Sequence, residues 1–320
     1  MQAAWKRWLL AAALAWGIPW VMMGVLTGLA PQPTTESTVS TTRTLQETTA
    51  PLPMTITVLI DGKELDMALS DYLTGVLLGE LPSSFHMEAK KAQAVVARTY
   101  TLRTIASMDK HNGAICTDSR CCQAYMNPDA CRNPQAVVQA KQAVGETADM
   151  VLTYGGELIL ATYFSCSGGY TEDAVAVWGG DVPYLQAVES PGEEQAYCFT
   201  DRVTFSAQEF QRALGVSLSG SPATWFGGAT YTEGGGVNTM KIGGRVYKGT
   251  DLRQLLGLRS TVFTVTTKEN TIIVDTKGYG HRVGMSQYGA QAMALAGKGY
   301  REILSHYYLN TILSKIEDMV

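Results

Sequence analysis

The 320-residue sequence contains no run of basic residues and no motif in which basic and aromatic residues alternate. Its formal net charge at pH 7 is -4, so the chain lacks the electrostatic footprint of a nucleic-acid-binding protein, and we expect no nucleic-acid partner. No repeat with the period of a solenoid is visible either. Glycine is abundant instead, at 32 residues, which favours a domain rich in turns.

Residues 8–30 lack Asp, Glu, Lys and Arg altogether. At about 1.5 Å per residue, such a segment is long enough to cross a hydrocarbon core about 30 Å thick, so we predict one transmembrane helix. Lys6 and Arg7 precede it, and the positive-inside rule then places residues 1–7 in the cytoplasm and the rest outside. The alternative is a cleaved signal peptide, but the apolar region of a signal peptide is usually about 7–15 residues long. We favour a retained anchor.

Residues 31–53 contain almost no large apolar side chains and are rich in Thr and Pro. Such a composition cannot bury a core, so we interpret this segment as a linker. The remaining residues, 54–320, suffice for one large domain. Their pattern predicts an α+β fold, with helices and short mixed or antiparallel strands in one extracytoplasmic catalytic domain.

Residues 54–60 alternate in the manner of a strand and end at the turn signal Asp61-Gly62. Hairpins are expected over residues 151–164 and 261–276. Apolar spacing and capping signals predict helices over residues 69–81 (with Ser70 as N-cap), 87–107, 136–147, 207–214, 286–296 and 300–307.

Glu80 is the first candidate for chemistry, because its neighbours are apolar or glycine and Pro82 ends the helix just beyond it. The negative end of the helix dipole and the apolar surroundings both disfavour the ionised carboxyl. Both effects raise its pKa, as a general acid working near neutral pH requires. The alternatives are a solvated helix-end Glu and a Glu paired with Arg98.

Two further residues have competing interpretations. Glu88 lies in the first turn of the second helix, where a Glu is favourable for capping alone, and we interpret it as structural. His281 lies in a glycine-rich loop, where the glycines permit close backbone approach or positive φ. His281 either contacts a sugar or completes a buried network, and the sequence does not decide between these roles.

Four ordered blocks carry a family resemblance. They are Gly79-Glu80-Leu81-Pro82 with residues 88–100, residues 165–172, residues 178–185 and residues 278–290. Together they resemble the stage II sporulation protein D family, which are peptidoglycan lytic transglycosylases of endospore-forming bacteria. The resemblance spans essentially all of residues 54–320, and the preceding anchor is similar to the layout of the family.

The resemblance implies a substrate and a reaction. The family cleaves glycan strands between N-acetylmuramic acid and N-acetylglucosamine without water, leaving a 1,6-anhydromuramoyl end. It prefers strands that a partner amidase has stripped of stem peptides. One carboxyl suffices for this reaction, whereas a hydrolase usually needs a second carboxylate. The family's acid falls on Glu80. Its helical arginine falls on Arg98, where the side chain would order Glu80 or hold the glycan, and its tyrosines fall on Tyr184 and Tyr288, which suit sugar stacking or hydrogen bonding. Arg282 is a departure, because the family often has glycine there.

Six cysteines are present, and four of them lie between Cys116 and Cys131. The pattern His111-x4-Cys116-x4-Cys121-Cys122 offers ligands compatible with zinc, and a disulfide within the cluster is the alternative. Some members of the family hold zinc through two cysteines spaced like Cys116 and Cys122. In those members a histidine stands where this chain has Cys121, so the third ligand stays open. Any zinc would be structural. Cys166 and Cys198 are either a disulfide or two packed thiols.

Two other functions compete with the transglycosylase. The wider family includes enhancers of wall amidases, which bind glycan and recruit a partner without cutting. A zinc-dependent wall hydrolase is a third reading, but a catalytic ligand set is not evident. The resemblance also implies a place: the mother-cell membrane facing the intermembrane space, alongside the amidase and the membrane scaffold of the engulfment machinery.

Overall fold

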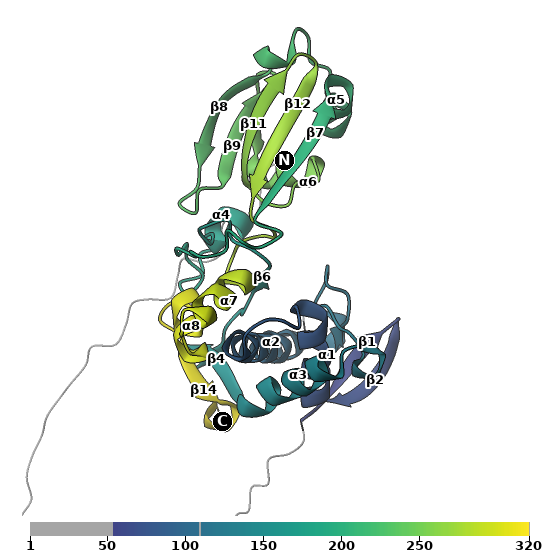
Figure 1. The fold of residues 1–320 in the computed structure, drawn as a ribbon, viewed down its shortest axis with the longest axis vertical. Coiled ribbons are helices and arrows are strands. Elements are labelled where there is room, and N and C mark those ends of the chain that lie inside the picture. The colour runs from purple at the N-terminus through teal and green to yellow at the C-terminus, as the bar shows by residue number, and fades with distance from the viewer. Residues whose placement is uncertain (1–53, 109, 320) are drawn as a thin grey trace, which may run out of the picture. The chain divides into compact units, whose positions relative to one another are not determined.

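The computed structural model describes residues 54–108 and 110–319, which belong to one compact unit, Pro51–Val320. The predicted cytoplasmic tail (1–7), anchor (8–30) and linker (31–53) lie outside the described residues. Among the helices that are described, none has both the length and the apolar character needed to span a bilayer. The described residues form a mixture of helices and strands, as the α+β prediction requires (Figure 1).

The first part of the fold packs three helices against a small sheet with the strand order β2-β1-β3. Its elements are β1 (Thr55–Ile60), β2 (Lys63–Ala68), α1 (Leu69–Glu80), α2 (Met87–Ser107), β3 (Ile115–Cys116) and α3 (Pro134–Glu146). Apolar residues of α1, α2, α3 and β1 form one core cluster. Helix α2 is buried along most of its length because it also packs against elements from the end of the chain.

A second core joins the other face of α2 to elements from the middle and the end of the chain. These elements are β4 (Met150–Tyr154), β5 (Glu157–Leu158), β6 (Tyr163–Phe164), α4 (Ala174–Trp178), β13 (Met285–Ser286), α7 (Gln287–Leu295), α8 (Tyr300–Tyr307) and β14 (Ile312–Lys315). Strand β13 pairs in parallel with β6, and β14 pairs with β4. Segments far apart in sequence thus meet beside α2, as Figure 1 shows.

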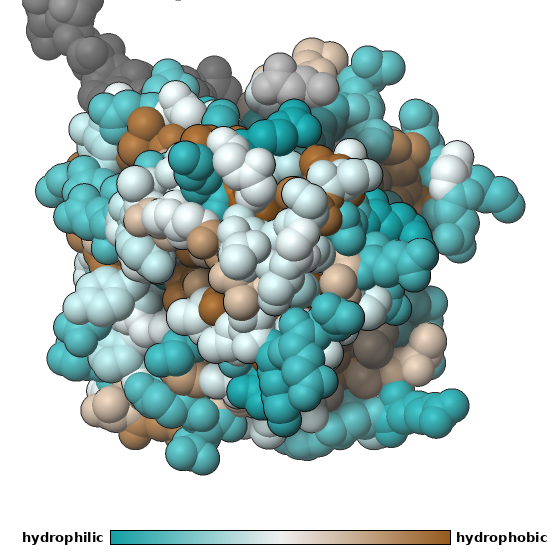
Figure 2. Space-filling view, turned by 90° about the horizontal axis from the view of Figure 1, so that it is seen from above, coloured by the Kyte–Doolittle hydropathy of each residue, from teal (hydrophilic) through white to brown (hydrophobic). Residues whose placement is uncertain are grey.

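Residues 200–277 form a lobe with its own hydrophobic core. It contains two three-stranded sheets, ordered β11-β12-β7 and β10-β9-β8. Its elements are β7 (Thr200–Ser206), α5 (Ala207–Leu214), β8 (Phe226–Tyr231), β9 (Val237–Ile242), β10 (Arg245–Lys248), α6 (Gly249–Leu255), β11 (Val262–Lys268) and β12 (Thr271–Lys277). The face seen in Figure 2 is mainly hydrophilic or neutral, with small separate apolar patches.

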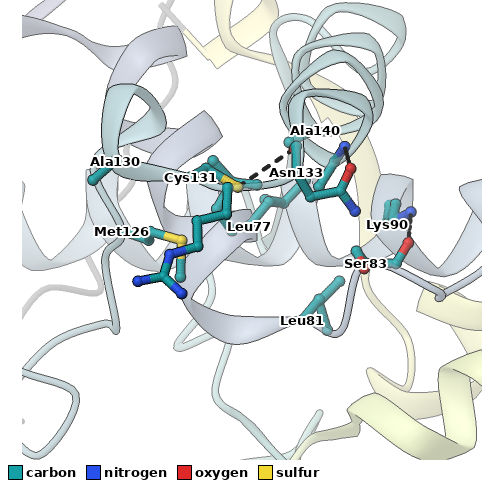
Figure 3. Close-up of a pocket in the computed structure, with 12 residues that line it drawn as sticks. Leu77, Leu81, Ser83, Lys90, Met126, Ala130, Cys131, Asn133 and Ala140 are labelled. Atoms are coloured by element: carbon teal, nitrogen blue, oxygen red, sulfur yellow. Dashed lines mark hydrogen bonds between the residues drawn. The ribbon is translucent and has the colours of Figure 1, made fainter.

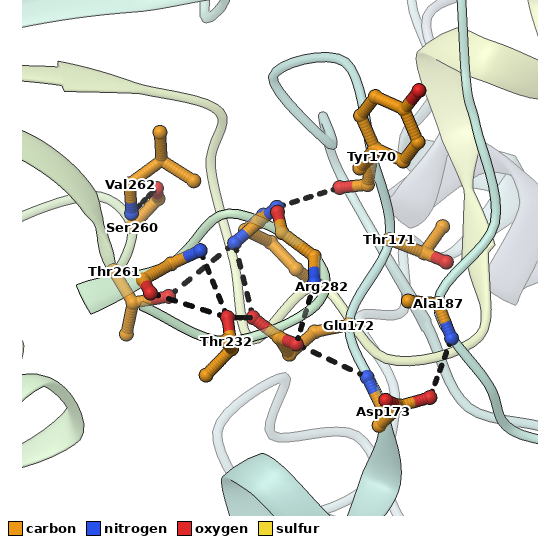
Figure 4. A network of polar contacts seen from close by, with 12 residues as sticks. Tyr170, Thr171, Glu172, Asp173, Ala187, Thr232, Ser260, Thr261, Val262 and Arg282 are labelled. Carbon is orange, nitrogen blue, oxygen red and sulfur yellow. Dashed lines mark hydrogen bonds and ion pairs between the residues drawn. The ribbon is translucent and has the colours of Figure 1, made fainter. Parts of the chain in front are cut away.

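Arg282 ties this lobe to the rest of the fold (Figure 4). Its φ of 68° lies in the left-handed region, and its side chain is buried. Its Nε donates to the carbonyl of Ser167 (2.8 Å), and its Nη2 donates to the carbonyls of Tyr170 (2.7 Å) and Gly234. Its Nη1 lies 3.5 Å from a carboxylate oxygen of Glu172. The arginine that departs from the family pattern therefore locks two loops and the lobe together.

Most of the expected elements are present, with two differences. The N-cap of α1 is Ala68, without a side-chain cap, so the prediction of Ser70 as N-cap is wrong. Asp71 does lie in the first turn, as expected. Strand β2, the short helices α4 and α6, and the sheet of β8, β9 and β10 were not predicted individually. The hairpin expected over residues 151–164 is limited to β4 and β5, because β6 pairs with β13 instead.

Candidate active site

Glu80 is the last residue of α1, and its local backbone explains its position. The helix stops there because Pro82 cannot continue it and disfavours helical backbone in the residue before it. Gly79 lets another segment approach, since a Cβ on Gly79 would lie 2.8 Å from the backbone nitrogen of Tyr125. Residues 124–125 therefore pack directly against the end of α1.

The Glu80 carboxylate accepts three hydrogen bonds, all from neutral groups. Its Oε1 accepts from the backbone N–H of Ala124 (2.7 Å) and from the hydroxyl of Tyr163 (2.9 Å). Its Oε2 accepts from the side-chain amide of Gln287 (3.4 Å). No ion pair of the described residues includes Glu80. Burial raises the pKa of Glu80, and the three hydrogen bonds oppose that rise in part.

Tyr163 is itself held by a buried chain of hydrogen bonds. The Gln123 amide donates to the hydroxyl of Tyr163 over 3.2 Å. The amide oxygen of Gln123 accepts from the hydroxyls of Thr101 (2.7 Å) and Tyr72 (3.4 Å). With its oxygen occupied by two donors, Gln123 presents its NH₂ to Tyr163, and the Tyr163 hydroxyl keeps its proton for Glu80. Burial also raises the pKa of Tyr163, so it remains a neutral donor.

Glu80 opens into a groove of about 600 Å³. It is the only acidic residue among the described residues that line this groove. Aromatic side chains form much of the wall, and Trp178 and Tyr279 are 47% and 43% exposed. Exposed aromatic rings beside a single carboxyl suit a groove that holds sugar rings.

His281 lines the same groove, close to Trp178, with ring centroids 5.4 Å apart. Its Nδ1 accepts a hydrogen bond from the N–H of Val283 (3.1 Å). Burial lowers the pKa of His281 to about 4, with a smaller effect from Arg253. The ring is therefore a neutral imidazole. It lies on the groove wall, as the sugar-contact alternative requires, and it bonds to backbone groups of Val283 and Tyr163, as the buried-network alternative requires.

The glycines before His281 allow two loops to approach closely, as expected. A Cβ on Gly278 would lie 2.8 Å from the carbonyl oxygen of Ser167, and one on Gly168 would lie 2.8 Å from the backbone of Lys277. Gly278, Gly280 and Gly168 all have positive φ. This approach aligns Tyr279 beside the segment that carries Tyr163.

The structure does not bring Arg98 to Glu80. Arg98 is 3% exposed, and it donates to the carbonyls of Met150 (3.0 Å) and Val144 (3.2 Å). It closes the end of α3 onto β4, because the guanidinium satisfies carbonyls that helix geometry leaves unpaired. Neither pairing with Glu80 nor direct contact with a glycan fits this position, so both expectations for Arg98 are wrong.

The two predicted tyrosines lie in different environments. Tyr184 belongs to the second core, is 8% exposed, and its hydroxyl accepts from the N–H of Leu160 (2.9 Å). Tyr288 is half-buried and follows Gln287, but it is not among the described residues that line the groove. Its ring packs edge-on against Phe85, with ring centroids 5.1 Å apart. Tyr184 does not line the groove itself, but its hydrogen bond to Leu160 supports a residue that does.

Glu88 has the structural role that we predicted. One of its oxygens accepts from Lys91 (2.8 Å), and the other accepts from the N–H of Tyr300 (2.8 Å). These bonds link the start of α2 to the start of α8. Glu88 is not among the residues that line the Glu80 groove.

The cysteine loop brings four possible metal ligands together. The ligand atoms of His111, Cys116, Cys121 and Cys122 all lie within 4.8 Å of one another. Three thiols and one imidazole fit a tetrahedral structural zinc site in both number and donor type. None of the described cysteines is in a disulfide, and Cys131 lies apart from the cluster.

The metal cluster and the Glu80 groove share one segment of the chain. Cys121 and Cys122 line the groove, and Gln123 and Ala124 follow them directly. Cys166 and Cys198 lie elsewhere as buried thiols, and Cys198 contacts the hydroxyl of Ser165 at 3.5 Å.

Comparisons with known proteins bear directly on this site. A family model described as Stage II sporulation protein matches residues 63–154. Stage II sporulation protein D of Bacillus subtilis is 38% identical over 262 residues, which cover 79% of this chain and 76% of that protein. The same-named protein of Bacillus amyloliquefaciens is 37% identical over 265 residues, covering 80% and 76%. This chain belongs to the stage II sporulation protein D family.

The family match includes the residues that surround Glu80. The region covered by the family model contains Glu80, Gln123, Ala124 and the cysteine cluster. A protein of B. subtilis named amidase enhancer is also similar, with 30% identity over 301 residues, which cover 76% of this chain but 40% of that protein. This chain is therefore also similar to a protein named for enhancing an amidase.

Three residues that contact or orient Glu80 were not predicted: Tyr163, Gln123 and Gln287. Gln287 belongs to the last family block, so its position in that block is a signal that could have found it. Tyr163 lies 83 residues from Glu80 along the chain, and no local pattern marks it.

Proposed function

We propose that this protein is a membrane-anchored lytic transglycosylase that cuts peptidoglycan glycan strands during engulfment in endospore formation. The observation that carries the proposal is the groove with one carboxyl, Glu80, which is held by neutral donors and has a raised pKa. A hydrolase would usually place a second carboxylate across the groove. The described lining offers none.

In the proposed reaction, Glu80 begins protonated. Its proton passes to the glycosidic oxygen as the bond from the muramic acid C1 breaks, and the bonding electron pair stays on that oxygen. The sugar becomes oxocarbenium-like, and Glu80 becomes a carboxylate. That carboxylate then takes the proton of the 6-hydroxyl, whose oxygen bonds to C1. Glu80 returns to its first state, and no water is consumed.

The neighbours of Glu80 suit both halves of this cycle. Burial favours the protonated acid before bond cleavage. The bonds from Ala124 and Tyr163 favour the carboxylate that exists afterwards. An ion pair would instead hold the carboxyl ionised throughout, so neutral donors are appropriate for a group that must both give and take a proton. Trp178, Tyr279 and His281 would contact the sugar rings.

We further propose that His111, Cys116, Cys121 and Cys122 hold one structural zinc ion. The metal would supply a cross-link within the loop and no reactive group. Such a cross-link would fix the position of the next two residues, Gln123 and Ala124. Ala124 donates to Glu80 directly, and Gln123 acts on Glu80 through Tyr163.

The cellular setting is also a proposal. Residues 8–30 would anchor the chain in the mother-cell membrane, with the N-terminus cytoplasmic and the domain in the intermembrane space. The substrate would be glycan that a partner amidase has stripped of its stem peptides, and a membrane scaffold would complete the machinery. The likeness to a protein named amidase enhancer supports the link to an amidase.

The test incubates the full chain, in detergent, with peptide-free glycan strands and identifies the products by mass spectrometry. We expect 1,6-anhydromuramoyl ends, and we expect them to disappear in Glu80→Gln. New reducing ends would point to hydrolysis and contradict the proposal. Retained glycan binding without cleavage would favour the second candidate, a non-catalytic glycan-binding enhancer of an amidase, which the same likeness supports.

A further inference from the structure

A second hollow lies beside α1, lined by residues that differ from those of the Glu80 groove. Its volume is about 420 Å³, and Figure 3 shows the side chains around it. Most of its wall is apolar and comes from the end of α1, the loop that precedes α3, and α3 itself: Leu77, Leu78, Leu81, Met126, Ala130, Ala136 and Ala140. Such a wall suits a small apolar body.

Lys90 lies at one end of this hollow, beside Ser83 (Figure 3). Lys90 is 5% exposed, and its Nζ donates to the carbonyl of Ser83 (2.8 Å) and to the side-chain oxygen of Gln139 (2.6 Å). Both acceptors are neutral. Burial lowers the pKa of Lys90, and no opposing effect of a nearby carboxylate accompanies it.

The next residue provides an internal contrast. Lys91 is paired with Glu88 at 2.8 Å and with Glu146 at 2.6 Å. Lys90 forms no ion pair among the described residues, although it is the more buried of the two. A buried ammonium without a counter-charge is costly, because neutral acceptors replace only part of the lost hydration. Here the ammonium retains a third N–H that its two acceptors do not use.

The charges around the hollow all have one sign. Arg132 also lines it and is exposed, whereas no Asp or Glu is among the lining residues that the structure describes. A hollow with apolar walls and only cationic charges complements an anion that carries a short apolar group. A carboxylate attached to such a group would bond to Lys90 and bury its apolar part against Leu77 and Leu81.

We propose that this hollow is a binding site for a small carboxylate ligand with a short apolar body, and that Lys90 holds the carboxylate. Two sources share this chemistry: the C-terminus of a peptide with small apolar side chains, and a short fatty acid. The proposal goes beyond glycan cleavage and does not depend on it, because the residues that donate hydrogen bonds to Glu80 do not line this hollow.

Isothermal titration calorimetry of the full chain in detergent tests the proposal with matched probes. Hexanoate is compared with hexanol, and acetyl-dialanine is compared with its C-terminal amide. We expect at least one carboxylate to bind about tenfold or more tightly than its uncharged partner, since a hydrogen bond to a charged group is stronger than a neutral one. The tighter of the two carboxylates identifies the source.

Two variants locate the binding. Lys90→Met should abolish the preference for the charged probe, whereas Lys141→Met removes the same charge from an exposed position on α3 and should leave it intact. If Lys90→Met does not fold, Ala130→Trp takes its place, because exposed Ala130 lines the hollow and a large ring there should block it.

Three results would overturn the proposal: equal affinity for charged and uncharged probes, unchanged binding in the folded Lys90 or Ala130 variant, or no carboxylate binding at millimolar concentration. The same titration in Glu80→Gln should give unchanged affinity. It therefore separates failure of this site from failure of the cleavage mechanism.

Discussion

The end of α1 contributes residues to two hollows, and each hollow contains an ionisable side chain whose hydrogen-bond partners are all neutral. In the groove, the carboxyl of Glu80 accepts only from neutral donors. In the hollow lined by Leu77 and Leu81, the ammonium of Lys90 donates only to neutral acceptors. Each charge is hydrogen-bonded, yet neither has a counter-ion among the described residues.

Two buried arginines that line neither hollow hold segments of the fold together. Arg282 and Glu172 face each other at 3.5 Å and tie loops together. Arg98 satisfies carbonyls at the end of α3 and at β4. The comparison teaches that a buried charged group without a counter-ion can bind a ligand or exchange a proton only where it lines a cavity, because only there can the ligand or the proton reach it.

Replacing Glu80 should give the largest effect. Glu80→Gln keeps the shape and removes the transferable proton, so the rate of glycan cleavage should fall by about 10²- to 10⁴-fold. Glu88→Gln is the matched control, because it alters a carboxyl that binds Lys91 and Tyr300 outside the groove. The rate of cleavage of peptide-free strands is measured for both variants. An equal loss of rate in both would contradict the assignment of Glu80 as the catalytic acid.

Breaking the buried ion pair between Arg282 and Glu172 should lower the stability of the fold and should not act directly on glycan cleavage. Arg282→Met leaves Glu172 buried without its partner, so unfolding should become easier by about 3–5 kcal/mol. Arg202→Met breaks an exposed pair with Asp275 and should leave the free energy of unfolding nearly unchanged. Denaturant unfolding of the full chain compares the two, and similar losses would show that burial of the Arg282 pair matters little.

Removal of zinc should disturb the groove and spare the Lys90 hollow. If free zinc stands about a hundredfold above its dissociation constant, chelation costs about 2.7 kcal/mol of stability. Cleavage should fall with it, because the cysteine loop leads directly into Gln123 and Ala124. Melting temperature, metal content and carboxylate titration are measured together. A chain purified without bound metal, or one unaffected by chelation, would rule out the structural zinc.

Tyr163→Phe should have a moderate effect on Glu80. The variant removes one donor that favours the carboxylate, so the pKa of Glu80 rises further and the rate falls about tenfold, the value of one hydrogen bond to a charged group. The basic limb of the pH–rate profile should move to higher pH. His281 does not produce that limb, because its pKa is about 4. Tyr154→Phe, outside the groove, should leave the profile unchanged.

The smallest effect concerns stability against pH. The pKa of Glu80 is raised in the folded state, so its contribution to stability is fully present below its unfolded pKa and is lost as pH rises through the folded value. Glu80→Gln should therefore be at least as stable as the parent at pH 7, and the difference should close toward pH 4. A variant that is less stable at pH 7 would show that the carboxylate is stabilised by the fold.

Periodicity located α3, α5 and α8, because their apolar residues concentrate on one face. Strand β2 was missed because Lys63–Ala68 is mostly polar and exposed, and only its pairing with β1 makes it a strand. The N-cap was misplaced because Ala68 ends β2 and leads straight into α1 without any capping side chain.

The sequence predicted the site residues only where neighbouring residues in the chain mark them. Glu80 stands out because it is a lone carboxyl in an apolar stretch, and the cysteine cluster stands out by spacing. Arg98 was misassigned because the family resemblance places it on the second helix but does not tell which element packs against it. Tyr163 and Gln123 reach Glu80 through contacts 40 to 83 residues apart, and folding alone creates those contacts.

The central claim is that Glu80 works without a second carboxyl and without water. Cleavage of peptide-free glycan in water enriched in ¹⁸O tests it most directly, with mass spectrometry of the new chain ends. The account predicts anhydro ends that carry no ¹⁸O from the solvent. New reducing ends labelled with ¹⁸O would contradict it, because they require water to attack the sugar.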